Sequence, residues 1–117
     1  MADGVLPLSA DSACPTALAV VTLREGQPSY SFYREGVADR DHTPQGVLAL
    51  LDTPPVGILH TGSLALVPPE HHKTLAVMRE ARERGWRISL DINLRPALAP
   101  DLATYRDAVL EAMALAD

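Results

Sequence analysis

The chain has 117 residues, of which 47% are hydrophobic, and ten basic against fifteen acidic residues give it a formal net charge of −5. This charge argues against nucleic acid or an anionic membrane as the main partner, and no apolar run approaches the roughly 20 residues of a membrane span. A single cysteine, Cys14, excludes a disulfide within the chain and indicates a reducing, cytoplasmic setting.

The first part of the chain predicts a β-hairpin followed by a short helix. Residues 16–23, TALAVVTL, are rich in Val and Thr and predict a buried strand, and residues 30–33, YSFY, predict its partner. Gly26 and Pro28 mark a connecting loop of about four to six residues. A polar loop follows, and Thr43-Pro44 then starts a helix as N-cap and first-turn proline, which Pro54-Pro55 ends.

The remainder alternates strands with helices. Strands are predicted at 56–63 and 86–93, and helices at about 70–84 and 99–117. Leu75, Met78 and Ala81 share one face of the helix predicted at about 70–84, with Val77 beside them. In the last helix the residues at apolar helical spacing are Leu102, Tyr105, Val109, Ala112 and Met113. This order predicts βαβ units, a parallel sheet and right-handed crossovers.

Polar residues lie at the carboxyl ends of both predicted parallel strands, the edge where such sheets bind ligands. Asp91, Asn93 and Arg95 alternate, so on an extended segment they face one side and suit a phosphate, a polyhydroxylated ligand or bound Mg²⁺. Gly62 and Ser63 leave room for a ligand at the other strand end. The structural alternative for the first group is a turn made by Asp91 and Asn93 with a solvated Arg95. For Gly62 and Ser63 it is an ordinary strand end.

Two further groups of side chains have chemistry that could serve a binding site. Phe32, Tyr33 and Arg34 combine aromatic faces with a cation, which suits a sugar with an anionic group, although an ordinary hairpin with a surface arginine fits as well. His60 is open to interpretation as a core histidine, and the neighbours His71 and His72 share no helix face, which argues against a joint metal site. The sequence contains no P-loop, no G-x-G-x-x-G and no G-x-S-x-G.

Three segments in register resemble the pfkB (ribokinase-like) carbohydrate kinases, closest to the fructokinase and 2-keto-3-deoxygluconate kinase branches. They are TALAVVTL…GQPSYSFYREGVAD, ILHTGSLAL and GWRISLDINLRPAL, and the resemblance covers roughly residues 16–117. It implies a partial ribokinase-like α/β fold, with a parallel sheet flanked by helices and a β-hairpin from the lid region. Residues 1–117 would form a single partial domain from the central part of a sugar kinase.

The resemblance also implies an activity, the transfer of phosphate from ATP with Mg²⁺ to a sugar hydroxyl. It assigns sugar binding to Phe32, Tyr33, Arg34, Gly62, Ser63 and Arg95, and proximity to phosphate and Mg²⁺ to Asp91 and Asn93. It implies pairing of two copies through the lid in a full-length relative. No direct metal ligand, nucleic acid or membrane is expected.

The sequence departs from this family in two places. No glycine-rich sugar-binding segment precedes residue 16, and the G-A-G-D motif with the family's catalytic base is absent, so no catalytic residue is assigned. We therefore expect an internal fragment that is inactive by itself. The alternatives kept open are a 2-keto-3-deoxygluconate kinase fragment, a nucleoside kinase of the same superfamily and a non-catalytic α/β binding module.

Overall fold

The computed structural model describes residues 12–52 and 56–117, and these form two compact units. The N-terminal unit ends at His42, the C-terminal unit runs from Thr43 to Asp117, and each is described by itself. The predicted helix end at Pro54-Pro55 lies outside the described residues. Within the described part of the chain, no helix combines the length and apolar character needed to cross a membrane.

The N-terminal unit contains the predicted hairpin. Strand β1 (Leu18–Arg24) pairs antiparallel with β2 (Gln27–Tyr33), and Arg24 faces Gln27 across the turn. The connection is therefore only Glu25-Gly26, whose φ angles of 50° and 78° are those of a tight turn that matches the twist of a hairpin. The predicted longer loop is wrong because Pro28 lies within β2, where an edge strand tolerates it.

The hairpin leaves its side chains open to solvent. Every residue of β1 is exposed, so the prediction of a buried strand is wrong for this structure. The reason is that a two-stranded ribbon has no second layer of its own to cover either face. A short 3₁₀ turn, η1 (Ala38–Arg40), follows the hairpin.

The C-terminal unit begins with the predicted capped helix, α1 (Pro44–Leu50). The Thr43 hydroxyl accepts a hydrogen bond from the Gly46 amide at 3.1 Å, which confirms Thr43 as the N-cap before a first-turn proline. Arg84, which follows the next helix, donates to the Leu48 carbonyl at 3.0 Å and pairs with Asp52 at 2.5 Å. These contacts attach α1 to the rest of the unit.

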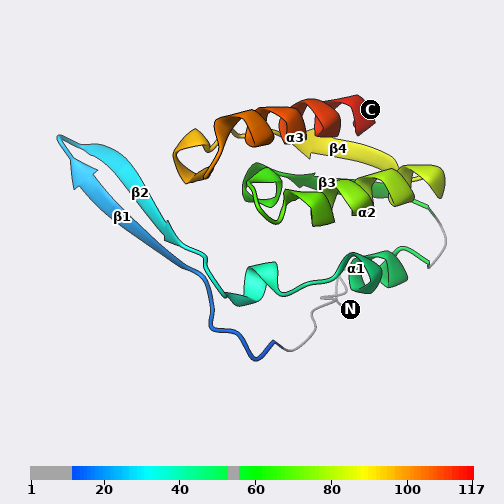
Figure 1. The fold of residues 1–117 in the computed structure, drawn as a ribbon, viewed down its shortest axis with the longest axis horizontal. Helices are drawn as coiled ribbons and strands as arrows, with labels where there is room; N and C mark the ends of the chain where they lie inside the picture. The colour runs from blue at the N-terminus through cyan, green and yellow to red at the C-terminus, as the bar shows by residue number, and fades with distance from the viewer. Residues whose placement is uncertain (1–11, 53–55) are drawn as a thin grey trace, which may run out of the picture. The chain divides into compact units, whose positions relative to one another are not determined.

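A parallel strand pair and two helices form the body of the C-terminal unit, as predicted. Strand β3 (Ile58–Gly62) pairs in parallel with β4 (Arg87–Asp91), and α2 (His71–Glu83) lies between them in sequence. Helices α2 and α3 (Leu102–Leu115) lie side by side over one face of this sheet (Figure 1). Short turns, η2 (Ser63–Leu66) and η3 (Pro96–Leu98), follow the two strands.

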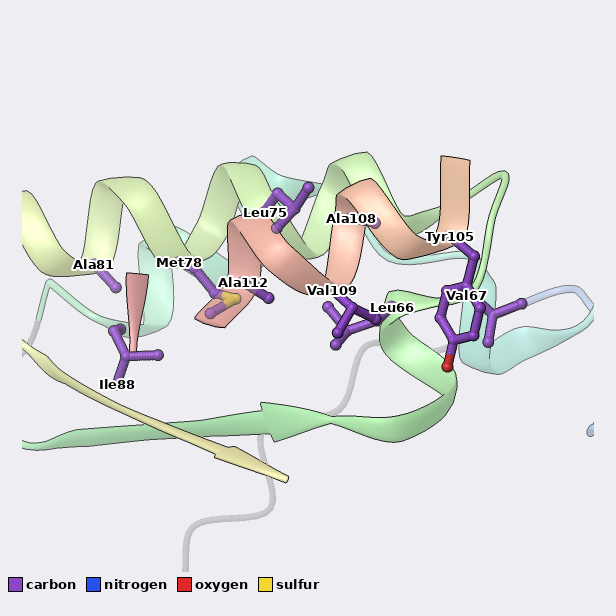
Figure 2. Close-up of a cluster of buried hydrophobic side chains, with 10 residues drawn as sticks. All are labelled: Leu66, Val67, Leu75, Met78, Ala81, Ile88, Tyr105, Ala108, Val109 and Ala112. Carbon is purple, nitrogen blue, oxygen red and sulfur yellow. The ribbon is translucent and has the colours of Figure 1, made fainter. Parts of the chain in front are cut away.

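The core lies between the two helices and the inner face of β4 (Figure 2). Leu66, Met78 and Ile88 are its largest fully buried side chains. The predicted apolar face of α2 is confirmed, and on α3 so are Tyr105, Val109 and Ala112. Leu102 and Met113 share the predicted helical spacing but are 61% and 51% exposed, because they lie outside the arc that meets the core.

Candidate functional site

The carboxyl ends of β3 and β4 lie directly beside each other. Gly62, the last residue of β3, is the register partner of Asp91, the last residue of β4. Gly62 has φ 145°, and a Cβ on it would lie 1.8 Å from the Asp91 carbonyl oxygen. The glycine is therefore required by the approach of the two backbones, a structural reason that is independent of any ligand.

Each strand is followed by a residue in the left-handed region of backbone space. Ser63 has φ 49° and Asn93 has φ 34°. Asparagine tolerates this conformation better than most residues do. Regular strand geometry ends at Asp91, so the predicted extended segment that would align Asp91, Asn93 and Arg95 on one side is wrong in its geometry. Successive side chains alternate between the two faces of the strand only as far as Asp91.

Arg95 is fixed by a contact that the sequence did not indicate. Its backbone amide donates to the Tyr105 hydroxyl at 3.0 Å, and Tyr105 of α3 is only 3% exposed. The Arg95 Nε atom is buried without a hydrogen-bond partner among the described residues. A buried guanidinium nitrogen without an acceptor is unusual and favours an oxyanion such as phosphate as its partner. The sequence indicates for Tyr105 only a position at apolar helical spacing, and nothing in that spacing indicates a link to Arg95.

The outer face of the β3–β4 pair is exposed, and it is polar beyond Ile58. His60 Nδ1 and Ser89 Oγ lie 2.9 Å apart in a cross-strand hydrogen bond between register partners. Asp91 follows two residues later on the same face of β4. The interpretation of His60 as a core histidine is therefore wrong, because its strand turns this side chain away from the helices.

In the N-terminal unit, Arg34 already has a carboxylate partner. Its Nε and Nη2 atoms lie 2.9 Å and 2.5 Å from Asp39 Oδ2, and the Arg34 side chain is only 15% exposed. Arg40 donates to the Arg34 carbonyl at 3.1 Å. The positive charge that sequence analysis predicted for an anionic group is therefore balanced within its own loop.

The two aromatic candidates beside Arg34 face opposite sides of the hairpin. Phe32 stacks on Tyr30 two residues earlier, with ring centroids 6.2 Å apart, whereas Tyr33 pairs with Leu18. Phe32 and Tyr33 thus cannot both meet one ligand lying on a single face of β2.

The described residues contain no cluster of three or more His, Cys, Asp or Glu that could hold a metal ion. Near the strand ends, Asp91 is the one carboxylate among the predicted site residues, which fits a role in binding hydrated Mg²⁺ but not a complete coordination shell. His71 and His72 lie edge to face at 6.0 Å, and His72 Nδ1 contacts the Pro69 carbonyl, a local structural role.

The structure pairs Gly62 with Asp91 in the C-terminal unit, and Ser63, Asn93 and Arg95 follow these two strand ends along the chain. The other three, Phe32, Tyr33 and Arg34, belong to the N-terminal unit. Small, amide, carboxylate and guanidinium groups at the strand ends of a parallel α/β sheet are chemically suited to phosphorylated or polyhydroxylated ligands.

Comparison with known proteins identifies relatives of this chain. The chain is 31% identical to a fructokinase of Xylella fastidiosa whose structure was solved with bound ATP, with a TM-score of 0.73 over 92% of this chain and 33% of that one. It is 39% identical over 111 residues to a fructokinase of Solanum tuberosum and 30% identical over 107 residues to one of Rhizobium leguminosarum bv. trifolii. A PfkB protein of Polaromonas sp. JS666, 23% identical, shares the fold with a TM-score of 0.68. No protein-family model matches the chain.

The chain is a relative of the pfkB carbohydrate kinases, and among them it is fructokinase-like. The matches span 92% of this chain but only about 33% of the potato relative and of the Xylella structure. These matches confirm the predicted family and fold class, and their length is consistent with the expected internal fragment.

Proposed function

We propose that this chain forms part of the substrate site of an ATP-dependent sugar kinase that acts on fructose. The observation that carries the proposal is the juxtaposition of the β3 and β4 ends, followed by Arg95 with its buried, unpartnered Nε. Similarity to fructokinases, including one whose structure holds ATP, supports it. Phosphoryl transfer needs positive and hydrogen-bonding groups where charge moves between donor and acceptor.

The proposed roles follow from the residue chemistry. Arg95 binds an oxyanion of the substrate or phosphate, held in place through its amide by Tyr105. Asn93 and Asp91 would hold the phosphate and hydrated Mg²⁺ region through their amide and carboxylate groups. When bound, ATP would supply the phosphoryl group for transfer to a sugar hydroxyl. Gly62 and Ser63 border the sugar.

The N-terminal unit adds the other part of the proposal, in which Arg34 contributes to sugar binding together with Phe32 or Tyr33, which face opposite sides of β2. Because Asp39 balances the Arg34 guanidinium, this group suits a neutral polyhydroxylated sugar better than an acidic one. Fructose is therefore favoured over 2-keto-3-deoxygluconate as the substrate.

Two copies would associate through the hairpins. One face of the hairpin is apolar throughout, and it is formed by Ala19, Val21, Leu23, Pro28, Tyr30 and Phe32. Exposed apolar ribbons of this kind mark association surfaces. Val21→Glu is expected to abolish concentration-dependent dimerisation in sedimentation experiments, whereas Thr22→Glu on the opposite face retains it. Equal effects of the two substitutions would contradict this association.

The cellular setting that we propose for this sugar kinase is the cytoplasm.

The chain alone is expected to show no turnover, because its 117 residues contain no G-A-G-D sequence to supply a catalytic base. The test is a chimera in which this chain replaces the matching third of the Xylella fructokinase, assayed for ATP-dependent phosphorylation. The chimera is expected to prefer fructose over 2-keto-3-deoxygluconate in kcat/KM by at least tenfold. A folded chimera without activity on either sugar would support a non-catalytic module instead.

A further inference from the structure

The ion pair between Arg34 and Asp39 is built by a short turn of the N-terminal unit. Gly36, between the two charged residues, has φ 60°, a left-handed conformation that glycine adopts without strain. The Arg40 amide then donates to the Val37 carbonyl at 3.1 Å within the 3₁₀ turn η1, which carries Asp39. The local backbone therefore directs the carboxylate back onto the Arg34 guanidinium, whose Nε and Nη2 atoms both contact Asp39 Oδ2.

Two further contacts fix this turn. The Ala38 amide donates to the Pro15 carbonyl at 2.8 Å, and the Arg40 guanidinium donates to the Arg34 carbonyl at 3.1 Å. Isolated surface ion pairs often contribute little, because holding two long side chains in one geometry costs entropy. Here the residues on both sides of Asp39 are held by hydrogen bonds, so its carboxylate is a fixed part of the surroundings of Arg34.

The charge beside Arg34 disfavours an anionic ligand. Residues 34–41 contain two basic and three acidic residues, which leaves this loop with a net charge of −1. A ligand carboxylate that approached Arg34 would have to displace Asp39 or lie against a like charge. A neutral sugar meets no such penalty, since its hydroxyl groups both donate to carboxylates and accept from guanidinium groups. The pair is therefore suited to sugar hydroxyls and unsuited to a sugar acid.

We propose that Asp39 is a specificity-determining residue: by pairing with Arg34, it prevents the guanidinium from binding the carboxylate of a sugar acid. The inference rests on the proposed function, in which Arg34 contributes to sugar binding. Without the Asp39 charge, the forked donors of Arg34 would match a ligand carboxylate. Discrimination between neutral and acidic sugars is thus achieved by repulsion of the wrong substrate as well as by contacts with the right one.

The test is Asp39→Asn in the single-chain chimera with the Xylella fructokinase. Asparagine keeps the size of the side chain, but its neutral amide no longer balances the Arg34 guanidinium. The ratio of kcat/KM for 2-keto-3-deoxygluconate to that for fructose is expected to rise about tenfold or more, mainly through a lower KM for the acid. This KM is expected to increase with ionic strength, because the new attraction is electrostatic. An unchanged ratio in a chimera that phosphorylates fructose would overturn the proposal.

Asp41→Asn is the matched control. It makes the same change of charge two residues further along the loop, where the Asp41 carboxylate accepts from the Ser12 hydroxyl at 2.6 Å. This control is expected to change the ratio by less than about twofold, and so is Asp39→Glu, which keeps the charge. Equal increases for Asp39→Asn and Asp41→Asn would contradict the proposal, because the net charge of the loop would then set the preference.

A double substitution and a binding measurement complete the test. Arg34→Ala added to Asp39→Asn is expected to abolish the gain for the acid, and a gain that persists without Arg34 would refute the proposal. If a folded chimera shows no turnover, the proposed function fails, but calorimetric titration with 2-keto-3-deoxygluconate still tests Asp39. Binding about tenfold tighter with Asp39→Asn than with the parent supports the proposal, and equal affinity contradicts it.

Discussion

At the residue scale, Gly62 is the position where the strand-end geometry is most sensitive to substitution. Gly62→Ala is expected to destabilise the C-terminal unit by about 3 kcal/mol or more, because it combines a backbone conformation open mainly to glycine with a collision against the Asp91 carbonyl. The measurement is urea unfolding followed by the fluorescence of Trp86, the single tryptophan.

Gly85→Ala provides the control for that experiment. Gly85 also has a positive φ, 86°, but a Cβ there would meet no atom within 4 Å. It is therefore expected to cost only the backbone strain of about 1–2 kcal/mol. If the two alanine variants unfold at the same urea concentration, the close approach of β3 to β4 is not what requires glycine at position 62.

Tyr105 is the second residue whose role can be isolated. Tyr105→Phe removes the acceptor of the Arg95 amide and leaves that amide without a partner, at an expected cost of about 1 kcal/mol. Hydrogen exchange of the Arg95 amide is expected to accelerate, while the core of α2 keeps its protection. Tyr30→Phe on the exposed hairpin is the comparison, and the assignment fails if the Arg95 amide exchanges equally in both variants.

At the element scale, the start of α3 depends on an ionised cap. Asp101 accepts hydrogen bonds from the side chain and amide of Thr104 and from the amide of Ala103, and these bonds, with the Thr104 side chain first, lower its pKa below the ordinary value of 3.8. A carboxyl that is more acidic in the folded state stabilises it above pH 3.8. This contribution is lost as the pH falls through the folded-state pKa.

The pH dependence of stability tests this cap. Asp101→Asn retains an N-cap acceptor but does not titrate, so the stability difference between the parent chain and this variant is expected to shrink as the pH falls below 3.8. Thr104→Val removes the largest cause of the lowered pKa and is expected to weaken the effect partly. A stability difference that stays constant from pH 6 to pH 2 would refute the role of Asp101.

Elements of the C-terminal unit could be predicted because local signals and packing agree there. Thr43-Pro44 marks a helix start, and the spacing of Leu75, Met78 and Ala81 marks the buried face of α2. The hairpin was predicted as an element, but its exposure was not, since a Val-rich strand looks the same whether or not a second layer covers it. For the same reason the sequence did not indicate which apolar face of α3 would be buried.

At the scale of the whole molecule, the resemblance of three motifs predicted the family. The tendency of parallel sheets to bind ligands at the carboxyl ends of their strands predicted the edge that carries the strand-end residues. The details required coordinates: the left-handed turn at Asn93, the Tyr105–Arg95 contact and the pairing of Arg34 with Asp39. Each depends on where the backbone turns after a regular element ends, and periodicity carries no information there. The phosphate and sugar roles remain predictions.

The most direct test of these roles is the effect of Arg95 on the catalytic efficiency of the chimera with fructose and ATP. Arg95→Ala is expected to lower kcat/KM at least a hundredfold, because the guanidinium, whose Nε atom is buried without a partner, would no longer bind an oxyanion of the substrate or phosphate. Arg87→Ala, at the exposed opposite end of β4, is expected to change it less than threefold. Equal activity of the Arg95 and Arg87 variants, with both proteins folded, would contradict the assignment of the β3–β4 strand ends to phosphoryl transfer.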